Sequence, residues 1–168
     1  MPFTPFHFGP HACASLPLYR HLDIPVFIGT NVVIDLEPLL VMTFGLNYPL
    51  HGYCHTLLIG GLAGLLFATA VFPFRSFIGK AMTFLRLPYE PTYAKMAVSG
   101  VLGAWLHVLF DAPLYNDIRP FYPLQANPLL GLLSSRTVYL VCSACFLPAL
   151  VLYIYVAFME KRTQGKSR

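Results

Sequence analysis

The longest uncharged stretch of the chain constrains its fold most. Thr137–Met159 runs for 23 residues without Asp, Glu, Lys, Arg or His, and the charged residues Glu160-Lys161-Arg162 follow it at once. About 20 apolar residues in a helix cross the hydrocarbon core of a bilayer, because each residue advances the helix by about 1.5 Å. This stretch therefore predicts a membrane-spanning helix.

Two further apolar stretches predict two more spans. Leu57–Phe74 contains 18 uncharged residues with three glycines, and Met96–Phe110 is interrupted only by His107. Glycines let neighbouring helices approach closely inside a membrane. Both stretches are therefore expected to be spans that pack against other helices.

The first 50 residues predict shorter segments. Met1–Tyr19 is uncharged but holds four prolines, and Ile24–Ile34 is only 11 residues long. The polar residues Arg20–Asp23 between them predict the turn of a helical hairpin, either spanning or re-entrant. The expected fold is an all-α integral membrane protein with about four to five helical segments, the first two short or re-entrant. Residues 1–168 are expected to form a single transmembrane helical domain.

Composition excludes two other classes of protein. Of the 168 residues 57% are hydrophobic and 11% charged, with a mean hydropathy of +0.63, whereas ordinary soluble domains are about 25% charged. A typical soluble enzyme is therefore excluded. The net charge of +4 is small and scattered, which excludes nucleic-acid binding through a basic face. The expected partner is the lipid bilayer.

Basic residues predict the orientation, because they gather on the cytoplasmic side of a membrane. Residues 75–95 hold four Lys or Arg and the residues after 160 hold another four, against two in 112–136. We expect an integral inner-membrane protein with a cytoplasmic C-terminus and with 112–136 outside. In that outer segment Asp117, Arg119 and Asn127 could contact a substrate, and a lone Arg suits a phosphate. A salt bridge or a loop cap explains these residues equally well.

Histidines and acidic residues recur four positions apart. Three pairs have this spacing: His7 and His11, His51 and His55, and His107 and Asp111. Residues at i and i+4 share one helix face, close enough for both side chains to reach one metal ion. Asp35 and Glu37 add two carboxylates one residue apart.

The predicted orientation brings these groups together. If Leu57–Phe74 runs inward and Met96–Phe110 runs outward, the His51 and His107 pairs both lie at the outer side of the membrane. A hairpin that returns to Asp35 adds its carboxylate there. Ionisable groups inside a membrane are costly and tend to mark functional sites. A site at the external face is therefore expected.

The residue types indicate the chemistry. Imidazole with carboxylate suits zinc and also accommodates manganese or iron, and the number of candidate ligands would allow two metal ions. A bound metal lowers the pKa of water enough to supply hydroxide near neutrality. The sequence therefore favours hydrolysis at the membrane surface. The location suggests a lipid or lipid-linked phosphoester as substrate.

Three motifs, in this order, resemble those of the inner-membrane-bound metal-dependent hydrolases: Asp35-x-Glu37, His51-Gly52-Tyr53-Cys54-His55-Thr56 and His107-x-x-x-Asp111. Members of that family show Asp-x-Asp, His-Arg-Gly-x-Thr-His-Ser and His-x-x-x-Asp, and the resemblance covers much of the chain. Here Glu37 stands where the second Asp would be, and the second motif is one residue shorter and lacks the Arg. The resemblance implies metal binding by the acidic and His residues of the three motifs.

The sequence hypothesis is thus a metal-dependent hydrolase. Its metal ligands are His11, Asp35, Glu37, His51, His55, His107 and Asp111, with Asp35 or Glu37 as general base and with His7 as an extension of the site. Three alternatives stay open: a haem-binding protein, an ion or metal transporter, and a non-catalytic scaffold. In the last of these the His pairs are polar residues at the level of the lipid headgroups.

Overall fold

A computed structural model describes residues 5–166 of the chain, with side chains as far as residue 159. Its regular structure is helical, and these residues contain no strand. The helices are α1 (Phe8–Ser15), α2 (Ile24–Phe44), α3 (Leu57–Val71), α4 (Arg75–Phe84), α5 (Tyr93–Asp111), α6 (Ser135–Ala144) and α7 (Phe146–Lys166), with 3-10 turns at Pro5–His7, Tyr53–His55 and Phe72–Phe74.

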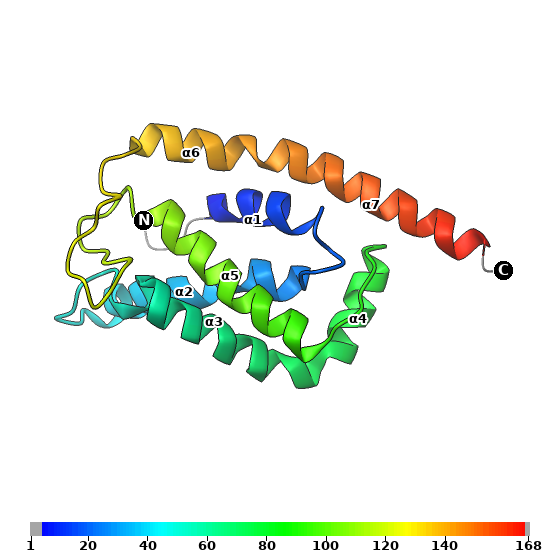
Figure 1. The fold of residues 1–168 in the computed structure, drawn as a ribbon, viewed down its shortest axis with the longest axis horizontal. Helices are drawn as coiled ribbons and strands as arrows, with labels where there is room; N and C mark the ends of the chain where they lie inside the picture. Colours follow the sequence, from blue (N-terminus) through cyan, green and yellow to red (C-terminus); the bar gives the residue numbers. More distant parts are fainter. Residues whose placement is uncertain (1–4, 167–168) are drawn as a thin grey trace.

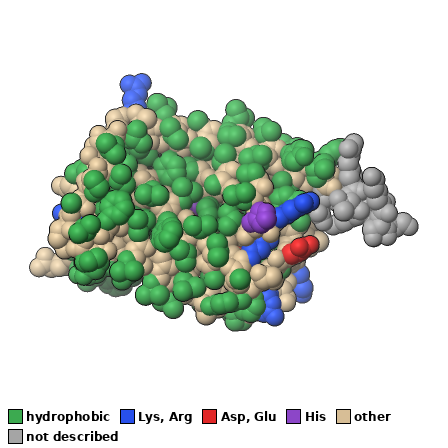
Figure 2. All heavy atoms as spheres, in the orientation of Figure 1, with side chains coloured by type: hydrophobic (Ala, Val, Ile, Leu, Met, Phe, Trp, Pro, Cys, Tyr) green, Lys and Arg blue, Asp and Glu red, His purple; other side chains and the backbone are tan. Residues whose placement is uncertain are grey.

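Four helical stretches are long and apolar enough to cross a membrane: Ile24–Phe44, Leu57–Phe84, Tyr93–Asp111 and Ser135–Met159. The outer surface is rich in apolar side chains along these helices (Figure 2). The prediction of an all-α membrane protein is confirmed, because a surface of this kind is stable in lipid and not in water.

The second segment is longer than predicted. The sequence indicated a short piece, Ile24–Ile34, whereas α2 continues through Pro38 to Phe44. Proline removes one backbone N–H and crowds the carbonyl four residues earlier, but spans tolerate it when neighbouring helices satisfy the freed groups. Of the first two segments only α1 is short, and Asp35 consequently lies within a span rather than at its end.

The helices form two groups that enclose α1. In Figure 1 α6 and α7 make a long rod along one side, and α1 lies between this rod and α2 and α5. The most extensive helix contact joins α3 to α5, and α2 packs against both. The loops that follow α2 and α5 meet at one end of the molecule, and α4 lies at the other.

The last predicted span contains a break. Thr137–Met159 was expected to be one helix, but α6 ends at Ala144 and α7 begins at Phe146. Pro148 explains the break, because its ring crowds the Ala144 carbonyl and its nitrogen cannot donate. The two helices still run on as one rod (Figure 1).

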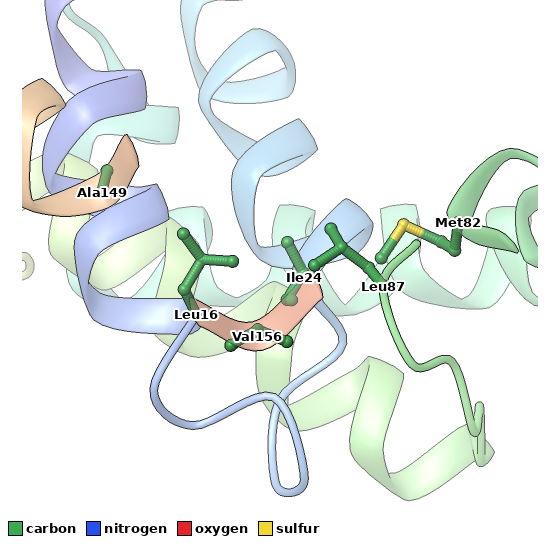
Figure 3. Packing of buried hydrophobic residues seen from close by; sticks show 6 residues of the cluster. All are labelled: Leu16, Ile24, Met82, Leu87, Ala149 and Val156. Atoms are coloured by element: carbon green, nitrogen blue, oxygen red, sulfur yellow. The ribbon is translucent and has the colours of Figure 1, made fainter. Parts of the chain in front are cut away.

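An apolar cluster fixes the end of the molecule where α4 lies. Leu16, Ile24, Met82, Leu87, Ala149 and Val156 gather there from four helices and their loops (Figure 3). Helix α2 begins in this cluster, capped by the Asp23 carboxylate, which accepts a hydrogen bond from the Val26 N–H at 3.1 Å. At 1.5 Å per residue, Asp35 lies about 16 Å further along the helix. The cluster thus anchors the helix that carries the site.

Glycines bring α3 and α5 into backbone contact. A Cβ atom added at Gly64 or at Gly100 would overlap the carbonyl oxygen of the other glycine. Because that neighbour is backbone, it cannot move aside as a flexible side chain would.

Replacing Gly100 with alanine is therefore expected to separate α3 from α5. We expect a loss of about 1–3 kcal/mol of stability, as for other overpacked sites, measured by thermal unfolding of the protein in detergent. Val98→Ala on the exposed side of α5 is the matched control, because Val98 is 49% exposed. Equal midpoints for the two variants would show that the close contact contributes nothing.

Candidate metal centre

Four buried side chains from three segments converge. Asp35 from α2, His55 from the turn before α3, and His107 and Asp111 from α5 each offer one ligand atom, and these atoms all lie within 4.8 Å of one another. All four residues are at most 5% exposed. Each of three motifs predicted from the sequence therefore supplies at least one residue of this group of four: the carboxylate pair, the second His pair and the His–Asp pair.

The distances suit a small metal ion. His107 Nε2 lies 3.3 Å from Asp35 Oδ1 and 3.3 Å from Asp111 Oδ2, and His55 Nε2 lies 3.9 Å from Asp111 Oδ2. Ligands about 2.0–2.2 Å from a tetrahedral zinc ion are separated by about 3.3–3.5 Å. The four residues need only small shifts to reach that geometry.

Two ring nitrogens of the group have no hydrogen-bond partner. Among the described residues, neither His55 Nε2 nor His107 Nε2 finds one, although both atoms are buried. The carboxylates are close to these nitrogens but outside hydrogen-bonding geometry. Buried polar atoms are normally satisfied, so two orphaned nitrogens that face carboxylates fit a site for a cation.

The charge of the group of four also fits a cation site. Within the described part of the chain, no Lys or Arg lies within 4.0 Å of the Asp35 or Asp111 carboxylate, and their only ion-pair partners are histidines. Two buried carboxylates are stable only with a compensating positive charge. A divalent cation would neutralise both.

Hydrogen bonds on the far side of each imidazole orient the rings. His107 Nδ1 lies 2.9 Å from Asn31 Oδ1, and His55 Nδ1 lies 3.3 Å from Glu37 Oε2. Each Nδ1–H can donate to its oxygen, which leaves the Nε2 lone pair for a metal. Glu37 also accepts from the Cys54 N–H at 3.1 Å, so its carboxylate supports His55 and stands outside the group of four.

The two N-terminal histidines differ in their surroundings. His7 touches the group, because its Nε2 lies 3.3 Å from Asp111 Oδ1 and its Nδ1 lies 3.2 Å from His107 Nδ1. Both ring nitrogens of His11 face backbone carbonyls, those of His7 at 2.8 Å and Gly103 at 3.0 Å. His11 is therefore placed beside the group of four and not in it.

His51 forms a separate pair with Asp117. Asp117 accepts from the His51 backbone N–H at 2.9 Å and lies 3.1 Å from His51 Nδ1. The imidazole stacks on Tyr115, with 4.0 Å between ring centroids, and meets the His55 ring edge-on at 4.8 Å. His51 thus stands next to the group of four, although the sequence predicted it as a ligand.

The electrostatics of this pair follow from its burial. Burial lowers the pKa of His51 and the nearby His55 lowers it further, against the opposing effect of Asp117. Burial acts to raise the pKa of Asp117, but the hydrogen bonds and charge of His51 outweigh it, so that pKa lies below its usual value. Asp117 is therefore an anion that accepts a hydrogen bond from the His51 Nδ1–H.

The position of His55 depends on a loop that is distant in sequence. Thr56 caps α3, accepting from the Ile59 N–H at 3.0 Å, and the Leu57 N–H donates to the Pro120 carbonyl at 2.8 Å. Spacing predicted that His51 and His55 share a helix face, whereas His55 lies in a 3-10 turn and His51 lies outside regular structure.

Two supporting residues were not among the predicted site residues. Asn31 precedes Asp35 by four positions, so the spacing that singled out the His pairs would have found it. Asp117 was noted only as one of several loop residues, because nothing local ties it to a histidine 66 positions earlier. Cys54 lies outside the group of four, and burial together with Glu37 raises the pKa of its thiol to about 11.

The fold and the site together define a helical membrane protein with a buried Asp/His group that could hold a metal ion. Comparison of the chain with protein-family models, with curated proteins and with solved structures gives no match. The resemblance to the inner-membrane-bound hydrolases therefore rests on the three motifs alone.

Proposed function

We propose that this protein is a metal-dependent hydrolase that acts at the membrane surface. The observation that carries the proposal is the pair of buried, unpartnered nitrogens, His55 Nε2 and His107 Nε2, that face two carboxylates. Two imidazoles with two carboxylates favour zinc, and manganese or iron are the alternatives.

In the proposed reaction a bound divalent ion would supply hydroxide from water near neutral pH and polarise the substrate. The protein's own residues position the components. Glu37 and Asn31 hold the two imidazoles, and His7 holds Asp111. His51, oriented by Asp117, is the residue we assign to accept a proton from water at Nε2. Sequence reasoning gave that role to Asp35 or Glu37, but both of their carboxylates already contact a ring of the group.

The orientation belongs to the same proposal. We place the protein in the inner membrane with the site on the external face and the C-terminus in the cytoplasm. The support is the distribution of basic residues, because the end of the molecule near α4 carries more Lys and Arg side chains than the site end (Figure 2). That asymmetry is typical of the cytoplasmic side.

The donor set favours this proposal over haem binding. Haem iron takes protein ligands on the two faces of a flat macrocycle. Here carboxylate oxygens lie 3.3 Å from His107 Nε2 on two sides, which is the arrangement of a compact ion site. Absorption in the Soret region on purification would reverse this preference.

Removal and return of the metal is the direct test. Protein purified in detergent without chelator is expected to contain about one equivalent of zinc, manganese or iron per chain, measured by elemental analysis. Dialysis against a chelator should abolish hydrolysis of a chromogenic phosphodiester, and adding back the same ion should restore it. Unchelated protein without metal, or activity that survives chelation, would contradict the proposal.

A further inference from the structure

A cavity adjoins the candidate metal centre. Its volume is about 330 Å³, and it is lined by Tyr48, Pro49, His51, Gly52, Tyr53, Thr56, Asp117, Arg119, Tyr122 and Gln125. His51 lies between the cavity and the candidate metal centre, because it lines the cavity and its ring centroid is 4.8 Å from that of His55. A ligand in this cavity would therefore reach the metal centre past His51.

A buried histidine belongs to the wall of this cavity. The His51 residue is 3% exposed, and Asp117 engages its backbone N–H and its Nδ1. With the proton held at Nδ1 by Asp117, Nε2 offers its lone pair to whatever occupies the cavity.

Arg119 gives the cavity an available positive charge. One guanidinium nitrogen donates to the backbone carbonyls of Asn116 at 2.5 Å and Ile118 at 3.1 Å. No carboxylate of the described residues pairs with the guanidinium within 4.0 Å, and Asp117 is already engaged by His51. The remaining N–H groups of an arginine can bind a phosphate by two parallel hydrogen bonds.

The level of the cavity in the membrane indicates the source of such a phosphate. The lining residues lie in the two loops that connect spans, after α2 ends at Phe44 and after α5 ends at Asp111. Three tyrosines line the cavity, and their rings contact one another at 6.3 Å (Tyr48 and Tyr53) and 5.2 Å (Tyr53 and Tyr122) between centroids. Tyrosines are enriched at the level of the headgroups.

We propose that this cavity binds the phosphate of a lipid headgroup, with Arg119 as its phosphate contact. The inference rests on the proposed hydrolase function and names the substrate class of that site. In the reaction the oxygen of water bonds to phosphorus and the phosphoester P–O bond breaks. One water proton passes by way of His51 Nε2 to the leaving alcohol oxygen, and the other ends on the phosphate product or in solvent.

Binding can be measured without turnover. The full chain in detergent is loaded with Mn²⁺ and titrated with short-chain phosphatidic acid, and paramagnetic broadening of the lipid ³¹P resonance reports phosphorus near the metal. Wild-type protein is expected to broaden the signal. Arg119→Gln should need about tenfold or more lipid for the same effect, because the variant loses the charge-assisted hydrogen bonds to the phosphate.

Controls separate the possible outcomes. Arg136→Gln changes an exposed arginine of the same outer segment that does not line the cavity, and it should bind as wild type does. If Arg119→Gln fails to fold, Arg119→Lys replaces it, and we expect weaker binding there because lysine lacks the planar fork.

Three results would overturn the inference. Inorganic phosphate that binds as tightly as the lipid would assign the cavity to soluble phosphates. Mn²⁺-loaded protein without ³¹P broadening, or with broadening unchanged in Arg119→Gln, would remove the lipid site and leave the hydrolase proposal standing. A chain that binds no metal ion at all would refute the proposed function itself.

Discussion

Replacing His107 with alanine is expected to abolish metal binding. His107 Nε2 is the atom closest to both carboxylates of the group, and its loss leaves Asp35 and Asp111 buried without the nitrogen that completes the set. Elemental analysis of the purified variant should show almost no metal. Affinity should fall by more than the 10- to 100-fold that is typical when only a supporting hydrogen bond is lost.

Variants of the supporting residues provide a comparison for the metal affinity of His107→Ala. Asn31→Ala and Glu37→Ala remove a partner of an imidazole Nδ1 but no ligand atom, so each should weaken metal binding by about 10- to 100-fold. His21→Ala is the matched control, because His21 is an exposed histidine in the turn before α2 and its loss should leave the metal content unchanged. Full metal occupancy in a folded His107→Ala variant would refute the assigned site.

His51→Ala should separate metal binding from hydrolysis. Because the structure places His51 beside the group of four and pairs it with Asp117, the variant is expected to keep its metal. Loss of a residue that transfers a proton should reduce kcat by about 100- to 10,000-fold. The measurement compares metal content and phosphodiester hydrolysis in the same preparation, beside His55→Ala, which should lose both.

Asp117 is a positioning residue in this account. Asp117→Asn should also keep the metal. Its effect should fall mainly on kcat rather than KM, because it disturbs the proton position on His51 while the amide keeps nearly the size of the carboxylate at the cavity wall. Loss of metal from His51→Ala as complete as that from His55→Ala would instead restore the ligand role that the sequence spacing predicted.

Residue spacing along the chain was enough to predict part of the site. His107 and Asp111 lie on one face of α5 as the four-residue spacing predicted, because α5 is a regular helix through both positions. The His51–His55 spacing predicted the same arrangement and led to a different one. The chain there forms a short 3-10 turn whose position depends on the Pro120 carbonyl, and a distant hydrogen bond leaves no mark in local spacing.

The length of α2 is a second feature that the sequence alone did not predict. The sequence predicted a segment that ends at Ile34, yet α2 continues to Phe44, six residues beyond Pro38. The continuation depends on the surroundings of the helix, since α2 packs against both α3 and α5. Asp35 thereby lies buried inside a span, whereas the sequence predicted it just after the end of a short segment.

By itself the sequence determined the class of fold, because long uncharged stretches can satisfy their backbone in a membrane only as helices. It also determined which residue types were available for the site. The tertiary structure decided their roles. His55 lies beside His107 and Asp111, whereas His51 pairs with Asp117. Both ring nitrogens of His11 face backbone carbonyls. The physical reason is that ligand geometry depends on distances of a few ångströms between segments far apart in the chain, and these are set by helix packing and loop hydrogen bonds.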